Sequence, residues 1–332
     1  MSPGVSVRRV VVDAPRTLRV EEAVLPERPA AGAARLRTRA IGICGSDVHV
    51  LAGHHPFVSY PVYPGHELVA EVEAVGDGVD AAWVGRRVVL EPGLSCGLCR
   101  TCRRGDTHLC ESLRVMGFQA PGGMADAFDA PSHRLHALPD AIATEHGALV
   151  EPLAVATRAV RAAGPLAGRD VLVLGAGPIG LVCALVARAD GAQVQVVDLD
   201  AARRTLAANA FGFAVAPAAT PDTVDVAFEC VGAEAALRGA VAAVRKGGTV
   251  LVIGVHGRDA ALQVGIIQDR ELCLRGTLMY QSQDFARAIA LLEGGTLDVG
   301  PLIGARVPLA RAAEGYATAE RGGAVLKVVL VP

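Results

Sequence analysis

Lysine and aromatic residues are scarce in this 332-residue sequence. Two lysines stand against 30 arginines, and Phe, Trp and Tyr together make up 4% of the chain. Basic and acidic residues almost cancel, at 32 and 34. The net charge of −2 argues against a nucleic-acid partner, because such proteins usually carry a clear basic excess. Hydrophobic residues, at 52%, exclude a disordered chain, and the scarcity of aromatics means a core of Ala, Val and Leu.

The sequence also lacks a long apolar run. The longest covers residues 171–187, which is 17 residues and short of the roughly 20 that a membrane-spanning helix needs. Three glycines within this run are better explained by a phosphate-binding turn. No signal-peptide pattern is present near the first residue. We therefore expect a cytoplasmic protein without a membrane partner.

The two halves of the sequence differ in their residue patterns, which indicates two domains. The length of the chain also favours two domains. Prolines and glycines interrupt the first 150 residues densely, and residues 68–75 alternate between apolar and charged side chains, as in an irregular antiparallel barrel. From residue 171 on, short apolar strands alternate with helical patterns, which is typical of a parallel sheet with crossover helices. A further helix is predicted over residues 284–293, and a last strand over residues 325–331.

A glycine-rich turn follows the first of the parallel strands. Gly175, Gly177 and Gly180 have the G-x-G-x-x-G spacing where a strand passes into a helix. Glycines there allow a tight turn and a close approach to a pyrophosphate, which the helix N-terminus binds. Asp198 ends the next strand, where a carboxylate binds the ribose hydroxyls of NAD. The alternative is a glycine-rich turn without a ligand. The predicted cofactor-binding residues are Gly175, Gly177, Pro178, Ile179, Gly180, Asp198 and Arg203.

Four of the eight cysteines lie close together in the sequence, at Cys96, Cys99, Cys102 and Cys110. Four thiolates complete the tetrahedral coordination of zinc and leave no open position, which predicts a structural site. The surrounding lobe, about residues 91–114, has no hydrophobic pattern able to hold a fold by itself. Disulfides are disfavoured in a reducing compartment. A nucleic-acid-binding zinc ribbon, which nearby arginines would allow, is disfavoured by the charge balance.

Three further residues form a mixed set of thiol, imidazole and carboxylate. Cys44 lies in the run Gly-Ile-Cys-Gly-Ser-Asp-Val-His, His66 lies in Pro-Gly-His-Glu, and Glu151 opens the second half of the chain. Three protein ligands leave a fourth position for water or substrate, which is the pattern of catalytic zinc. Taken singly, Cys44 also fits a buried small side chain and His66 a structural turn histidine. Their spacing does not show whether they form one metal site, since the three residues are far apart in the sequence.

These motifs, in this order, resemble those of the zinc-dependent medium-chain alcohol dehydrogenases over essentially the whole chain. Residues 45–49 and 151–155 resemble the sorbitol, butanediol and threonine dehydrogenase branch. The resemblance implies an α/β architecture, with a GroES-like β-barrel catalytic domain and a Rossmann domain built on a doubly wound parallel sheet. The implied bounds are 1–149 for the catalytic domain, 150–289 for the NAD-binding domain and 290–332 for a return to the catalytic domain. A homodimer or homotetramer is expected.

The resemblance also assigns the catalytic metal ligands. Cys44 and His66 match zinc ligands, and Glu67 matches a glutamate that ligates the zinc or supports it. Glu151 stands at the place of a further ligand and binds directly or through a water.

The remaining assignments concern proton transfer. Ser46 and His49 match a relay to solvent, with solvent itself as the alternative to His49, and Asp47 is placed to orient His66. Zinc acidifies a bound alcohol, and a hydride then passes from the alcohol carbon to NAD and leaves a ketone. The expected cofactors are NAD and two zinc ions per subunit, one catalytic and one structural.

The chain departs from sorbitol dehydrogenases at the substrate pocket. An Arg–Tyr pair grips polyol hydroxyls in those enzymes, whereas this chain has Met279-Tyr280, and Val50 replaces a tyrosine after the relay histidine. The predicted pocket walls are Val50, Phe57, Phe118 and Met279. We therefore expect a small-molecule secondary alcohol, such as a diol, polyol or cyclitol, and its ketone. Two alternatives are an amino-alcohol oxidation like that of L-threonine 3-dehydrogenase and a non-catalytic relative that binds NAD and zinc.

Overall fold

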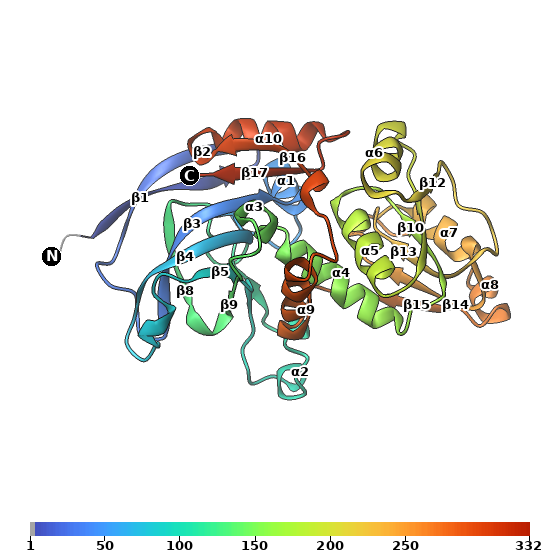
Figure 1. The fold of residues 1–332 in the computed structure, drawn as a ribbon, viewed down its shortest axis with the longest axis horizontal. Helices are drawn as coiled ribbons and strands as arrows, with labels where there is room; N and C mark the ends of the chain where they lie inside the picture. Colours follow the sequence, from blue (N-terminus) through green and yellow to red (C-terminus); the bar gives the residue numbers. More distant parts are fainter. Residues whose placement is uncertain (1–3) are drawn as a thin grey trace. The chain divides into compact units, whose positions relative to one another are not determined.

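The structure, a computed structural model, describes residues 4–332 and divides them into two units (Figure 1). The first consists of residues 4–151, 281–293 and 302–332, and the second of residues 152–280 and 294–301. The resemblance implies a return to the catalytic domain at residue 290, whereas the first unit already includes α9 (Ser282–Glu293). As bounds of domains, the ranges inferred from the sequence stay a prediction.

A seven-stranded sheet forms the frame of the first unit and draws on both ends of the chain. Its order is β16-β17-β3-β4-β5-β9, with β8 beside β3, so the C-terminal strand β17 lies next to β3 (Figure 1). The register pairs Ile43 with Val328 and Gly42 with Glu67. The end of β3 and the starts of β4 and β17 therefore lie together. The strands are β3 (Ala33–Ile43), β4 (Glu67–Val75), β5 (Arg87–Leu90), β8 (Ala127–Pro131), β9 (Leu135–Ala137), β16 (Ile303–Pro308) and β17 (Lys327–Val331).

Apolar side chains of this sheet pack against α10 and the hairpin of β1 and β2. The core contains Leu36, Ile41 and Leu68 together with Tyr316 of α10, all 2% exposed or less. Aliphatic residues supply most of this core, as the composition predicts. The other elements of the unit are β1 (Val5–Ala14), β2 (Thr17–Leu25), α1 (Gly45–Ala52), β6 (Gly93–Leu94), α2 (Arg100–Arg103), β7 (Arg114–Val115), α3 (Thr144–Gly147) and α10 (Ala312–Arg321). Short 3-10 helices lie at Ala81–Trp83, Thr107–Leu109, Ser132–Arg134, Gly300–Leu302 and Leu309–Arg311.

The second unit is the parallel sheet that the sequence predicts. Six strands pair in the order β12-β11-β10-β13-β14-β15, all parallel, and the order reverses between β10 and β13. Ligands of such sheets bind at the carboxyl ends of the strands near this switch point. The strands are β10 (Asp170–Leu174), β11 (Gln193–Val197), β12 (Ala214–Ala216), β13 (Val224–Glu229), β14 (Val244–Val252) and β15 (Cys273–Gly276). The helices are α4 (Val150–Ala163), α5 (Pro178–Ala189), α6 (Ala201–Phe211), α7 (Glu234–Ala243) and α8 (Val264–Asp269). No described helix combines the length and apolar character needed to cross a bilayer.

Candidate active site

Three metal-binding donors meet where β3, β4 and β17 come together. Cys44 follows β3 as the N-cap of α1, and His66 and Glu67 lie at the start of β4. Ligand atoms of these three residues all lie within 4.8 Å of one another. His66 and Glu67 are buried, and Cys44 is half-buried. Gly42 makes room for this cluster, because a Cβ at that position would lie 2.3 Å from Glu67 Oε2.

Asp47 supports both the cysteine and the histidine. It is wholly buried on α1, its Oδ2 accepts a hydrogen bond from Cys44 N at 2.9 Å, and its Oδ1 lies 3.7 Å from His66 Nδ1. Neither Oδ1 nor Nδ1 has a hydrogen-bond partner among the described residues. Burial opposes protonation of His66, but Asp47, Cys44 and Glu151 outweigh it and raise the imidazole pKa well above its usual value. Surroundings that attract a proton this strongly also favour a metal cation.

Lys327 belongs to the site, although no sequence motif indicates it. Its Nζ lies 2.7 Å from each carboxylate oxygen of Glu67 and 3.4 Å from Ile43 O. Burial opposes the charge of Lys327, yet the Glu67 carboxylate and the Cys44 sulfur raise its pKa. Both oxygens of Glu67 are therefore already held by a buried cation. Glu67 can ligate a metal only if it shares its carboxylate with Lys327 or gives up this ion pair.

Glu151 lies near this group but outside the set of three converging donors. It is half-buried in the first turn of α4, and its charge helps to raise the pKa of both His66 and Lys327. A carboxylate near the site fits either a direct metal ligand or one that acts through a water. The role of Glu151 stays a prediction. Thiolate, imidazole and carboxylate are the donors that zinc prefers. The residues present therefore fit a catalytic zinc ion.

The predicted relay residues lie on α1. Ser46 is half-buried, and His49 is exposed three residues later, so the two are neighbours on the helix surface. His55 is an addition that no sequence signal indicated. Its ring stacks on Phe118 at 4.8 Å, and the same Phe118 ring lies 4.8 Å from that of His66. Burial and the charges of His49 and His66 lower the pKa of His55, which favours a neutral ring.

The four predicted pocket walls have different surroundings. Phe118 covers the His66 ring, and Phe57 is 73% exposed beside His55. Val50 packs instead in a small core cluster and is 1% exposed, so its side chain offers little surface to a ligand. Met279 lies in the second unit, on the turn that follows β15. The pocket set as a whole stays a prediction.

The clustered cysteines form a second metal centre. The four sulfur atoms lie within 4.8 Å of one another, with Cys96 and Cys102 4.0 Å apart and Cys99 and Cys110 3.9 Å apart. Four sulfurs bound to one zinc ion lie about 3.8 Å apart, given the usual Zn–S bond length. Backbone N–H groups of Leu98 and Cys99 donate to the Cys96 sulfur, and that of Cys96 donates to the Cys110 sulfur. The geometry fits a closed, structural zinc site.

The glycine turn has the form that a dinucleotide needs. Gly175 has a φ of 101°, and a Cβ at Gly180 would lie 1.7 Å from Gly175 O, so only glycine lets α5 follow β10 this closely. Gly177 is the N-cap of α5, and Pro178 and Ile179 form the first turn. A Cβ at Gly177 would meet nothing within 4 Å, which leaves open space before the helix N-terminus. A pyrophosphate fits this position.

Asp198 closes the same turn from the neighbouring strand. Its two carboxylate oxygens accept hydrogen bonds from Ala176 N at 2.7 Å and Asp200 N at 2.8 Å. Arg203 Nη1 lies 3.9 Å from the carboxylate, while Arg204 donates to the backbone carbonyl of Asp198. The arrangement places a carboxylate beside the glycine turn, as the binding of ribose hydroxyls requires.

A second buried carboxylate, which the sequence did not reveal, shapes the adjoining loop. Glu229 ends β13, is 0% exposed and accepts hydrogen bonds from Val231 N and Gly232 N at 2.8 Å. His256, on the loop after β14, lies 3.2 Å from its other oxygen. A Cβ at Gly175 would lie 2.9 Å from the Val231 side chain, so this loop abuts the glycine turn. Glu229 thereby fixes one wall beside the cofactor turn.

Comparison with known proteins assigns the family. The alcohol dehydrogenase GroES-like domain matches residues 30–140, and the zinc-binding dehydrogenase family matches residues 178–294. The chain is 35% identical to 2-dehydro-3-deoxy-L-galactonate 5-dehydrogenase of Pseudoalteromonas atlantica, over 87% of this chain and 88% of that one. It is 33% identical to sorbitol dehydrogenase of Homo sapiens, over 94% and 92%. The crystal structure of 2R,3R-butanediol dehydrogenase from Bacillus subtilis is similar with a TM-score of 0.90 and 28% identity, over 98% of this chain and 99% of that one.

These similarities confirm the family and the fold inferred from the sequence. Two other similar solved structures hold a nicotinamide cofactor, NADP in one and NADH in the other. The four-cysteine site and the Cys44–His66–Glu67 site are the two metal centres expected of the family. The chain belongs to the zinc-binding medium-chain alcohol dehydrogenases, in the sorbitol, butanediol and polyol branch, and is a zinc-dependent dehydrogenase that acts on CH–OH groups.

Proposed function

We propose that the protein oxidises a secondary alcohol of a polyol or sugar acid to the ketone, with NAD as the hydride acceptor. The observation that carries this proposal is the convergence of the Cys44, His66 and Glu67 donors within 4.8 Å in a buried, carboxylate-rich site. The glycine turn and Asp198 supply the second requirement, which is a place for the dinucleotide.

Oxidation of the alcohol removes two hydrogens, one as a proton and one as a hydride, and different residues take part in each removal. Bound zinc supplies a Lewis acid that lowers the pKa of a coordinated hydroxyl. Cys44 and His66 would hold the metal, and Asp47 faces His66 Nδ1, which leaves Nε2 as the nitrogen that would bind it. Ser46 accepts the hydroxyl proton, and His49 passes it to solvent. NAD would be held by the glycine turn and Asp198 and would supply the acceptor for the hydride of the alcohol carbon, which becomes the carbonyl carbon.

A substrate panel of hexitols, aldonic acids, vicinal diols and cyclitols tests the proposal. We expect NAD-dependent turnover of at least one class, measured by the absorbance of the NADH formed. Turnover is expected to be lost in Cys44→Ser, because a metal ligand is removed. The control is Cys273→Ser, which changes an exposed thiol on β15. Turnover that survives in Cys44→Ser, or in zinc-depleted protein, would contradict the assignment of the metal site.

Asp198→Ser is expected to weaken NADH binding about tenfold, because a charged hydrogen-bond acceptor for the ribose is lost. Removing the carboxylate also removes its repulsion of a 2′-phosphate, so the preference for NADH over NADPH is expected to shrink. Fluorescence titration of both cofactors gives the two dissociation constants. Asp140→Ser is the matched control, since the Asp140 side chain is 99% exposed. An unchanged ratio of the two constants would show that Asp198 does not select the cofactor.

A homo-oligomer is part of the same proposal. β15 is the last strand of the six-stranded sheet and pairs with β14 on one side only, as far as the described strands show. Such an edge offers unpaired backbone groups to a second copy of the chain.

A further inference from the structure

One buried side chain of the second unit joins the loops that follow β13 and β14. Glu229 is the last residue of β13 and is 0% exposed. Its Oε1 accepts hydrogen bonds from Val231 N and Gly232 N at 2.8 Å, and its backbone carbonyl accepts one from Gly254 N at 2.9 Å. His256 Nε2 lies 3.2 Å from the other carboxylate oxygen, Oε2. We call Glu229 and His256 the Glu229–His256 pair.

The two loops pack backbone against backbone, without room for a side chain between them. A Cβ at Gly254 would lie 2.2 Å from Gly232 N, and a Cβ at Gly232 would lie 2.4 Å from Val255 O. The loop after β13 in turn abuts the glycine turn, since a Cβ at Gly175 would lie 2.9 Å from the Val231 side chain. A shift of the loop after β14 would therefore displace the loop that borders the cofactor turn.

Beyond Gly254, the loop after β14 depends on His256. Among the described hydrogen bonds, that of His256 is the one that ties residues 255–260 to the rest of the unit, and Ala261 N makes the next bond along the chain. Residues 257–259 are exposed, whereas the His256 side chain is 18% exposed. The imidazole is therefore the anchor that keeps this loop beside the loop after β13.

The place of the two loops in the sheet indicates which part of a dinucleotide they meet. A dinucleotide binds across the point where the strand order reverses, with one nucleotide on each half of the sheet. That point lies between β10 and β13. Asp198 directly follows β11 and is placed for the ribose of the adenosine half. The loops after β13 and β14 are left for the nicotinamide half, and there Val231 and Val255 present apolar side chains that are 51% and 75% exposed.

We propose that the Glu229–His256 pair is a positioning device for the nicotinamide half of the cofactor. The inference rests on the proposed function, because it takes NAD as the dinucleotide bound at the glycine turn. His256 acts through Glu229 and the two loops, and not by contact with the reacting atoms. Loss of the imidazole frees residues 255–260, so that binding of the nicotinamide half must first order them. That ordering costs affinity for the whole cofactor but not for its adenosine half.

The proposal is tested by calorimetric titration of the zinc-loaded enzyme with NADH and with ADP, which is the adenosine half of the cofactor with two phosphates. In His256→Ala, the Kd of NADH is expected to rise about fivefold to tenfold, while that of ADP stays within about twofold. A general loss of structure would weaken both ligands alike. An equal effect on both ligands, or none on NADH, overturns the proposal.

A conservative variant tests whether the hydrogen bond is the cause. His256→Gln keeps a side-chain N–H donor and is expected to bind NADH within about twofold of the wild type. A loss as large as that of His256→Ala would overturn the role of the bond to Glu229. His133→Ala is the matched control, because it removes an exposed imidazole from the first unit and is expected to bind both ligands as the wild type does.

Amide hydrogen exchange of the enzyme without cofactor tests the anchoring separately. The amides of Val231, Gly232 and Gly254 are bonded to Glu229 and are expected to exchange at least about fivefold faster in His256→Ala, because the loops loosen. Wild-type exchange at these amides overturns the proposal. If the wild type binds neither NADH nor ADP, the proposed function fails and this inference fails with it. If it binds both and His256→Ala does not differ, only the positioning role fails.

Discussion

Lys327→Met is expected to lower the free energy of unfolding of the metal-free protein by about 3–5 kcal/mol. The lysine Nζ lies 2.7 Å from both oxygens of Glu67, and the two side chains are 2% and 1% exposed. The substitution therefore leaves a carboxylate in the core without its counter-ion. Asp47, also wholly buried, adds a second negative charge nearby that repels Glu67. Urea unfolding of metal-free wild type and variant measures the difference.

Zinc is expected to restore most of this loss. Glu67 is one of the three donors that lie within 4.8 Å of one another, and without Lys327 both its oxygens are available to the metal. A ligand that binds only the folded state stabilises it according to its affinity, so the unfolding midpoint should rise more in the variant than in the wild type when zinc is added. Absorption spectra of the cobalt-substituted proteins report separately on whether Glu67 has joined the ligand set.

The chain contains a matched control for this experiment. Lys246, the other lysine, is exposed on β14, and Lys246→Met is expected to change the free energy of unfolding by no more than about 0.5 kcal/mol. An equal, small effect of both substitutions would contradict the importance of the buried pair. A large loss in Lys327→Met that zinc does not reduce would show that Glu67 remains unavailable to the metal.

The second unit could be predicted in some detail because its signals are local. Strands that are buried on both faces read as short apolar runs, and each crossover helix follows its strand directly in the sequence. β10, β11, β13 and β14 accordingly alternate with helices α5, α6 and α7, as the pattern from residue 171 on predicts. The sheet of the first unit is different. β17 and β3 come from opposite ends of the chain, and no local pattern indicates that Val328 pairs with Ile43.

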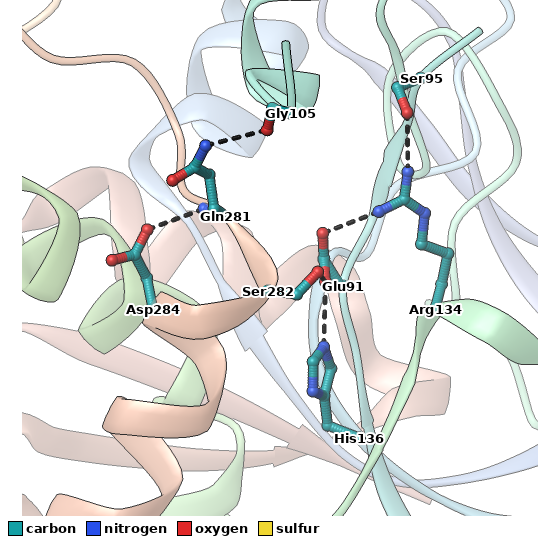
Figure 2. Close-up of polar contacts among 8 residues, drawn as sticks. All are labelled: Glu91, Ser95, Gly105, Arg134, His136, Gln281, Ser282 and Asp284. Carbon is teal, nitrogen blue, oxygen red and sulfur yellow. Dashed lines mark hydrogen bonds and ion pairs between the residues drawn. The ribbon is translucent and has the colours of Figure 1, made fainter. Parts of the chain in front are cut away.

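The residues of the candidate site differ in the same way, because some have a local sequence signal and others do not. Cys44, His66 and the four clustered cysteines are rare residue types in distinctive motifs, so the sequence could identify them. Lys327 pairs with Glu67, and Glu91, which directly follows β5, accepts a hydrogen bond from Ser282 (Figure 2). These partners are distant in the sequence, and only the fold shows that Lys327 and Glu91 are buried and paired. A lysine inside an apolar strand of an arginine-rich chain is the one signal that could have drawn attention to Lys327. Glu91 follows a strand without any such signal.

Cys102→Ser is expected to open the four-cysteine lobe while the rest of the first unit stays folded. Leu98 and Leu109 are 73% and 42% exposed, so little apolar packing holds the lobe without a metal. Structural zinc sites of this kind supply the folding free energy of their own segment. Tryptic cleavage at Arg100 and Arg103 is therefore expected to become about tenfold faster or more, because local opening exposes the backbone to the protease. Peptide mapping over a digestion time course measures this rate.

Zinc content distinguishes loss of the lobe site from general misfolding. The two metal-binding groups predict two zinc ions per chain in the wild type and one in Cys102→Ser. Cys273→Ser, which changes an exposed thiol outside both groups, should keep both ions and the wild-type cleavage rate. Loss of both ions, or cleavage throughout the first unit, would contradict a locally folded lobe.

The same variant also shows how far the lobe supports α9. Ser95 and Gly105 contact Arg134 and Gln281 from inside the segment that the metal orders. An opened lobe should therefore raise hydrogen exchange over residues 281–285. If these amides stay protected, Glu91 and the stacked His136 and Phe285 rings are sufficient to hold the helix. In that case the structural zinc stabilises only its own lobe.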